Sequence, residues 1–396
     1  MRITLSSWRV THSGIAMAIA AIAASAIAGE PGARGAAHRT ATSVFADLVE
    51  SHRSGASAQS ESLLDALSQH PRPVLRAIAE RAAEPDRSLD VANAALLMLR
   101  RFGAHEDVAL GAALHREGAD AELQATWIAI ATRDSRTLTV LDGLVRTLPG
   151  EVQAIAVRTV ETVGTPEAAE WLARCAQRVP EVRCEALARL GRMVESKPFP
   201  APEEALAVVR NVIGGIGSEA LREAVVAAGR MEDGDSIPHL VAMLAEEDPG
   251  LRADAAWALQ RITGLKLRER RERWEDWYAS ELAWWRDQSD QAFDDLQSPE
   301  AAERTRALME ISSHRASRDR LASKVIPLLE HEEPETAKLA AWTLRVLRSK
   351  CAVGPLIRAL DRSDPEVARE AWHALRGITR KDLPEDATRW RAACPG

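Results

Sequence analysis

Residues 251–259 have the sequence LRADAAWAL, and the pattern returns as VRCEALARL at 182–190 and as VAREAWHAL at 367–375. A proline stands two residues before the start of each stretch. Self-similarity at a period of roughly 30 to 40 residues is typical of proteins built from stacked repeats, in which each unit buries its apolar face against its neighbours. This recurrence therefore predicts the architecture before any local argument does.

Each stretch fits the second helix of a helical hairpin. Such helices are predicted to open at Val91, Leu123, Val152, Val182, Leu221, Leu251, Ala301, Thr336 and Val367. A small residue such as Ala255 usually follows four positions after the opening residue, and a leucine such as Leu259 often follows after eight. Positions 0, 4 and 8 share one helical face, so we expect this stripe to be buried and its small residues to let neighbouring helices approach closely.

The first helices of the hairpins repeat as well, since IPHLVAML at 237–244 matches VGPLIRAL at 353–360 at an offset of 116 residues. These phrases resemble HEAT repeats, especially the short bacterial type, over roughly residues 73–380. The resemblance implies an all-α fold: an α-solenoid of about nine stacked antiparallel helical hairpins, a HEAT-like superhelix whose second helices line a concave binding surface. It implies no reaction.

The N-terminus has the pattern of an export signal. Arg2 and Arg9 come without an acidic residue, and a short apolar run then ends at Ala26-Ile27-Ala28, a small-x-small cleavage site. We therefore expect a protein that is exported to the bacterial cell envelope, periplasmic or secreted. A retained signal anchor is the alternative.

The repeats and their interruption predict the domain organisation. The expected parts are a signal peptide (1–28), a flexible leader (29–57), an N-terminal part of the solenoid (58–264), a Trp-rich helical insertion (265–297) and a C-terminal part of the solenoid (298–396).

The four cysteines fall into two pairs that hairpins could bring together. Cys175 and Cys184 flank one turn, and Cys351 and Cys394 flank the last hairpin. An exported protein meets an oxidising environment, so two disulfides are predicted. The alternative is four buried thiols, since connectivity does not follow from sequence alone.

Five aromatic residues gather in the insertion, at Trp274, Trp277, Tyr278, Trp284 and Trp285. Their spacing places the rings in one stripe of a long helix. The favoured interpretation is a core patch that covers the seam made by the insertion. The alternative is a partner-binding face that uses Trp274, Trp277 and Trp284, because Trp and Tyr are frequent in binding hot spots.

Trp257 and Trp342 each lie six residues after the opening residue of a second helix. Six steps of 100° place them opposite the buried stripe, on the face turned toward the concave groove. We expect these two side chains to anchor a partner there. The alternative is that each ring packs over neighbouring alanine or arginine side chains.

Neither charge nor motifs indicate catalysis. The formal net charge of −7 argues against a nucleic-acid partner. The sequence contains no Walker loop, no HExxH and no nucleophile elbow. We therefore predict a non-enzymatic scaffold that binds a protein or peptide, with no cofactor and no metal. A carbohydrate- or wall-binding module that uses exposed Trp residues is one alternative, and a HEAT-like lyase is a second.

Overall fold

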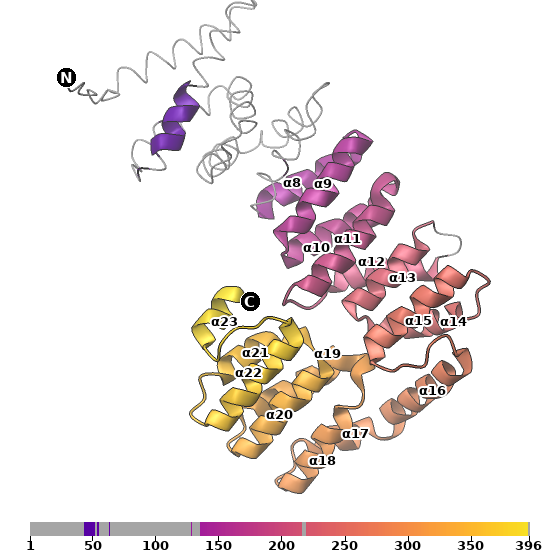
Figure 1. The fold of residues 1–396 in the computed structure, drawn as a ribbon, viewed down its shortest axis with the longest axis vertical. Coiled ribbons are helices and arrows are strands. Elements are labelled where there is room, and N and C mark those ends of the chain that lie inside the picture. The colour runs from indigo at the N-terminus through magenta and orange to yellow at the C-terminus, as the bar shows by residue number, and fades with distance from the viewer. Residues whose placement is uncertain are drawn as a thin grey trace, which may run out of the picture. The chain divides into compact units, whose positions relative to one another are not determined.

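The computed structural model describes residues 43–51, 54, 63, 128, 135–215 and 219–394, and every secondary-structure element in them is helical. The chain divides into two compact units, residues 1–163 and 164–396 (Figure 1). The predicted signal peptide and the predicted helix starts at Val91 and Leu123 lie outside the described residues.

In the first unit the described residues form a helix over 43–51, within the predicted leader, and a later hairpin. The hairpin consists of α8 (Ser135–Leu144), η2 (Val145–Thr147) and α9 (Gly150–Val163). Val152, Ala156 and Val160 on α9 are buried, which is the predicted stripe of positions 0, 4 and 8. The side-chain amide of Gln153 donates to the Val145 carbonyl at 3.0 Å and ties α9 to η2.

The second unit begins with a group of hairpins that we name the N-terminal stack. Its elements are α10 (Pro166–Arg178), η3 (Pro180–Val182), α11 (Arg183–Ser196), α12 (Glu203–Gly214), α13 (Leu221–Met231), η4 (Gly234–Ser236), α14 (Ile237–Met243) and α15 (Pro249–Thr263). Each first helix packs on the second helix that follows it, and the second helices α11, α13 and α15 pack side by side (Figure 1).

The predicted insertion forms α16 (Arg271–Asp287) and α17 (Ser289–Asp295). Helix α16 packs against α14, and α17 packs against α18 (Ala301–Ile311), so the two occupy the first-helix position before α18. After α18 the chain forms η5 (Arg315–Ser317), which packs against α15 and η4.

We name the remaining hairpins the C-terminal stack. Its elements are α18, η5, α19 (Arg318–Val325), η6 (Ile326–Glu330), α20 (Pro334–Leu347), η7 (Lys350–Ala352), α21 (Val353–Ala359), α22 (Pro365–Thr379) and the closing α23 (Ala387–Ala393). The second helices α18, α20 and α22 again pack side by side, and α23 packs on α21 (Figure 1). The predicted all-α solenoid of stacked hairpins is confirmed in the described part of the chain.

The second helices begin where the sequence signals predict. A proline opens α15, α20 and α22, where its missing N–H is not needed. The Asp248 side chain accepts from the Gly250 N–H at 2.8 Å, and Asp364 accepts from the Glu366 N–H at 2.9 Å. An acidic cap of this kind also offsets the positive end of the helix dipole.

The small residues of the predicted stripe are buried, among them Ala255, Ala340 and Ala371. The predicted opening residue Ala301 is instead exposed. On α18 the buried residues are Arg304, Ala307, Leu308 and Ile311, so the stripe begins later than expected. The register differs because Arg304 is buried through its bonds to the Ser298 and Pro299 carbonyls, a role that an apolar pattern does not reveal.

The first predicted disulfide is not formed, since neither Cys175 nor Cys184 takes part in a disulfide bond. Cys175 is buried on α10. Cys184 lies on α11 near Glu223, and burial together with this carboxylate raises the pKa of its thiol. The two side chains therefore have different surroundings although one short turn joins their helices.

Cys351 and Cys394 are also free. The Cys351 thiol lies beside Asp319, and burial and this carboxylate raise its pKa to about 11. Burial likewise raises the pKa of Cys394, whose charged neighbour is Lys381. The second pairing is therefore corrected as well: the two thiols sit among different groups.

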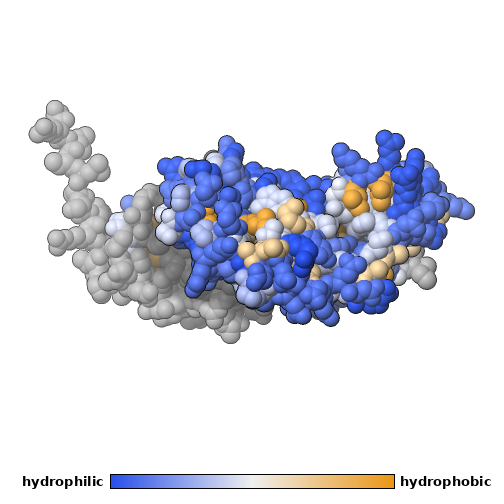
Figure 2. All heavy atoms as spheres, turned by 90° about the horizontal axis from the view of Figure 1, so that it is seen from below, coloured by the Kyte–Doolittle hydropathy of each residue, from blue (hydrophilic) through white to orange (hydrophobic). Residues whose placement is uncertain are grey.

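The surface is mostly hydrophilic on the face shown in Figure 2, and its hydrophobic patches are small and separate. Within the described residues, no helix is both long enough and apolar enough to cross a membrane.

Close packing of the second helices predicts a difference between two glycines. A Cβ on Gly229 of α13 would lie 2.8 Å from the Ala258 Cα and 2.7 Å from the Trp257 ring, whereas a Cβ on Gly354 of α21 would meet nothing within 4 Å. We expect Gly229→Ala to lower the free energy of unfolding by about 1–3 kcal/mol through overpacking. Gly354→Ala should leave it unchanged or raise it by up to about 1 kcal/mol. Urea unfolding measures both, and equal effects would contradict the close approach.

Candidate functional site

The second helices of the N-terminal stack converge at their C-terminal ends. Glu195 on α11 pairs with Arg230 on α13, at 3.6 Å between Nε and Oε2, and with Arg261 on α15, at 2.7 Å between Nη2 and Oε1. Helix α13 packs between α11 and α15. Glu195 therefore links three successive second helices, and we name this side of them the inner surface.

The C-terminal stack contacts the C-terminal end of α11 as well. The Lys350 ammonium of η7 donates to the Val194 carbonyl and, at 3.3 Å, to the Glu195 carbonyl. Arg380, which follows α22, lies 3.8 Å from Glu195, measured from Nη1 to Oε1. Residues far apart in the sequence therefore meet at the C-terminal ends of the second helices.

A second contact between the stacks lies beside the first. The buried Arg318 of α19 pairs with Glu232 and donates to the Ile262 carbonyl at the end of α15. A Cβ on Gly234 would lie 2.0 Å from the Ala316 carbonyl oxygen, so η4 and η5 touch through backbone. The absence of a side chain at residue 234 is what permits this contact.

We name the charged residues at this junction the central charge cluster. Its cations are Arg230, Arg261, Arg315, Arg318, Arg348, Lys350 and Arg380, and its carboxylates are Glu195, Glu232 and Asp319. Positive charge is in clear excess here, although the whole chain carries a formal charge of −7.

Three members of the cluster occupy an unusual backbone position. Glu232, Arg348 and Arg380 follow the last residues of α13, α20 and α22 with φ of 57°, 60° and 58°. Gly264 holds the corresponding place after α15 with φ of 82°. Glycine is the usual residue at such left-handed caps, and a side chain there costs about 1 kcal/mol or more.

The sequence marks one of these cap positions, although the apolar periodicity alone does not reveal it. The offset of 116 residues that relates the first helices also relates Gly264 to Arg380. A charged residue in place of a capping glycine is an exception to the repeat. Such exceptions place charge at the inner ends of the helices.

Two guanidinium groups of the cluster have no partner. Within the described chain, Arg315 and Arg348 make no side-chain hydrogen bond or ion pair, and the Nε of Arg315 is buried without an acceptor. Burial, with repulsion from Arg318 and Arg348, lowers the pKa of Arg315. Burial also lowers the pKa of Lys350, from 10.5 to about 8.

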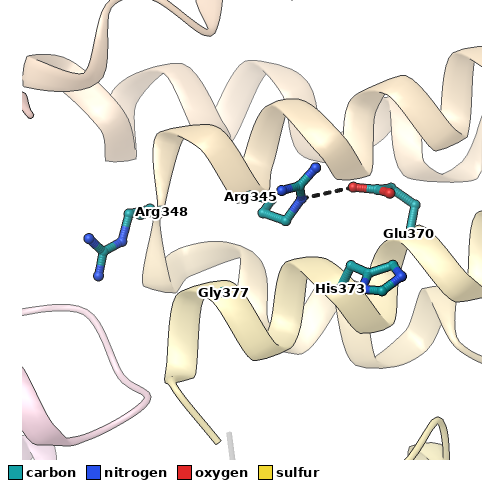
Figure 3. A pocket seen from close by; sticks show the side chains of 5 residues that line it. All are labelled: Arg345, Arg348, Glu370, His373 and Gly377. Atoms are coloured by element: carbon teal, nitrogen blue, oxygen red, sulfur yellow. Dashed lines mark hydrogen bonds and ion pairs between the residues drawn. The ribbon is translucent and has the colours of Figure 1, made fainter. Parts of the chain in front are cut away.

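Arg348 also lines an open pocket of about 660 Å³ on α20 and α22, together with Arg345, Glu370, His373 and Gly377. Arg345 donates to Glu370 at 2.9 Å across the two helices. Figure 3 shows the Arg348 side chain directed away from this pair, beyond the end of α20. The pocket therefore has a neutralised part between the helices and an unpaired cation at one end.

Trp257 has the exposure that the sequence predicted. It is 39% exposed on α15, and its ring lies 5.9 Å from the Arg261 guanidinium carbon. Since Arg261 lies on the inner surface, Trp257 does too. Trp342 on α20 is half-buried, three residues before Arg345. Trp257, Trp342 and the exposed His373 each lie eight residues after the proline that opens their helix.

The tryptophans of the insertion are placed differently. The Trp274 indole is fully buried and donates to the Arg268 carbonyl at 2.8 Å. The Trp284 indole is buried, stacks on His314 at 3.7 Å between ring centroids and donates to Glu310 at 2.6 Å. Neither can be presented to a partner, so that interpretation is corrected, because both rings fill the seam around α16. Trp277 is half-buried.

No group of three or more His, Cys, Asp or Glu side chains is placed to hold a metal ion in the described ranges. The arrangement instead offers hydrogen-bond donors and one exposed aromatic ring. These groups can bind an extended polar ligand.

No family model and no curated protein matches the chain. Solved structures with some likeness include the CpcE–CpcF complex of phycocyanin lyase from Nostoc, at 13% identity and a TM-score of 0.30, covering 69% of this chain and 94% of that chain. Human deoxyhypusine hydroxylase has 14% identity and a TM-score of 0.21, with coverage of 79% and 99%. Kap121p bound to Pho4p has 13% identity and a TM-score of 0.29, with coverage of 94% and 42%. These low scores carry no argument about function.

The buried amine of Lys350 predicts a pH effect on stability. Between about pH 8 and 10.5 the unfolded chain keeps a proton that the folded chain has released, so the free energy of unfolding rises with pH in this window. Lys350→Met removes this contribution. We expect the free energy of unfolding of the wild type, minus that of the variant, to rise by on the order of 2 kcal/mol from the lower to the upper end of this pH window.

Urea unfolding at a series of pH values measures this difference. Lys266→Met, at an exposed lysine, is the control and should follow the wild-type profile. Parallel profiles for wild type and Lys350→Met would show that the amine is not buried in this way.

Proposed function

We propose that the chain is a non-enzymatic scaffold of the HEAT-repeat type that holds an extended segment of a partner protein on the inner surface of its second unit. The observation that carries the proposal is the exposed Trp257 beside Arg261 on that surface. Trp and Arg are the residues most enriched in binding hot spots. Stacked hairpins add further strips of the same surface, which suits an extended ligand.

The charge around Trp257 favours a polypeptide over the alternative carbohydrate ligand. A sugar ring can stack on an exposed indole, but the neighbouring groups on the inner surface are mainly arginines and carboxylates in ion pairs. Such groups match the charged side chains and backbone carbonyls of a peptide. A polysaccharide that bound through Trp257 in a glycan array would support the alternative.

Panning a random-peptide display library on the full chain tests the proposal. The affinity of selected peptides is then measured by fluorescence anisotropy. We expect Trp257→Ala to weaken binding roughly tenfold or more, as for a hot-spot residue, and Trp342→Ala to weaken it less because its ring is half-buried.

Leu282→Ala is the matched control for these variants. Leu282 is 50% exposed, but it lies on α16, outside the second helices. Its removal should change affinity less than about twofold. The proposal is wrong if no peptide is selected, or if the selected peptides ignore both tryptophans.

We also propose that the protein is exported and that residues 1–28 are removed, on the basis of the N-terminal pattern alone. Expression of the full chain in a bacterium followed by cell fractionation and N-terminal sequencing should find a mature form that begins at Gly29 in the envelope fraction. An intact N-terminus on cytoplasmic protein would contradict export.

A further inference from the structure

Most cations of the central charge cluster have a clear structural role. Arg318 and Lys350 bind carbonyl groups at the ends of α15 and α11, where the helix dipole favours positive charge. Arg230, Arg261 and Arg380 surround the carboxylate of Glu195. These contacts give five of the cations a partner within the fold.

Arg315 and Arg348 remain after this assignment. Both lie near Arg318 and repel it, and Arg348 lowers the pKa of Arg315. Unpaired guanidinium groups at a partly buried site oppose folding, because burial removes water without supplying an acceptor. Arg348 adds backbone strain at φ of 60°. The fold therefore carries two cations that make no side-chain hydrogen bond or ion pair within the described chain.

A separate observation points to missing acceptors at the same place. The Arg318 side chain is 4% exposed, yet its Nε has no acceptor, and the same holds for the buried Nε atoms of Arg261 and Arg315. Buried donors in proteins are normally paired, so three unpaired guanidinium donors in one cluster are a distinct feature. The cluster therefore keeps donor capacity for an acceptor that the described chain does not supply.

We propose that Arg315 and Arg348 together bind a carboxylate of an acidic segment in the partner protein. This inference rests on the proposed scaffold function and names the chemistry of its partner. Guanidinium groups donate charge-assisted hydrogen bonds to carboxylates, and the bound oxyanion removes the repulsion between the two arginines. The same chemistry could be met by a free phosphate or sulfate, which the experiment separates.

An acidic polypeptide fits the surroundings better than a small ion. The pocket that Arg348 lines is open, so an extended segment can enter it. The chain as a whole is negative, so an excess of positive charge at this cluster favours an acidic partner here, and charge complementarity sets the register in which it binds.

The experiment uses the full chain and a dye-labelled decaglutamate peptide, with a labelled glycine–serine decamer for comparison. Affinity is measured by fluorescence anisotropy for wild type, Arg315→Gln, Arg348→Gln and Arg358→Gln. Arg358 is an exposed arginine on α21 and serves as the matched control for loss of one charge. We expect a roughly tenfold loss of affinity in each of the first two variants and less than about twofold in the control.

Thermal melting of the same variants supplies an independent readout. Because Arg315 and Arg348 repel their neighbours, Arg315→Gln and Arg348→Gln should melt at the wild-type temperature or above it. A clear loss of melting temperature in both would show a structural role and overturn the proposal. So would equal weakening by Arg358→Gln, which would show attraction to the surface in general.

Inorganic phosphate and sulfate distinguish the two sources of the oxyanion. If phosphate or sulfate at millimolar concentration displaces decaglutamate from the wild type but not from Arg315→Gln and Arg348→Gln, the two ligands share one site. Binding of phosphate or sulfate without binding of decaglutamate would overturn the acidic segment as ligand. Library-selected peptides that require Trp257 but ignore Arg315 and Arg348 would refute this inference and leave the proposed scaffold function standing.

Discussion

The close approach of the second helices in their C-terminal halves is the constraint on which the rest of the second unit depends. A Cβ on Gly191 of α11 would lie 3.0 Å from the Ala227 Cα, and one on Gly229 of α13 would lie 2.8 Å from the Ala258 Cα. Both glycines lie past the middle of their helices. The helix ends are therefore drawn together, and the stack curves toward them.

Curvature brings the charges together and so creates the site. Glu195 reaches arginines from α13 and α15 and the arginine that follows α22, while Lys350 of η7 binds the carbonyls of residues 194 and 195. Buried ion pairs repay their desolvation only when their geometry is good and their remaining donors are satisfied. Most cations of the cluster pair with a carboxylate or a carbonyl group, although the Nε atoms of Arg261 and Arg318 lack an acceptor. Arg315 and Arg348 make no side-chain hydrogen bond or ion pair within the described chain.

The insertion shows how one pattern can support two interpretations. The stripe of Trp and Tyr residues was readable from spacing alone, and a stripe of rings suits a core patch as well as an interface. Trp284 is buried because its indole finds His314 and Glu310 from the neighbouring hairpin. Those partners are about 26 to 30 residues away in sequence, and the local period contains no information about them. The disulfide prediction was wrong for the same reason, because proximity along a turn does not fix where a thiol points.

The sequence alone determined the hairpin repeat, the buried stripe with its small residues, the proline-led helix starts and the exposure of Trp257. All of these follow from contacts between near neighbours, which leave a regular period of apolar and small side chains. Only the tertiary structure decided that the two stacks meet at their inner ends, that Arg304 is buried and that Arg315 and Arg348 lack partners. Those features depend on contacts between distant hairpins, such as Lys350 with residue 194, and on the summed curvature of many helix pairs. Charged residues that meet through contacts between distant hairpins have no regular spacing in the sequence, so no sequence pattern predicts their cluster.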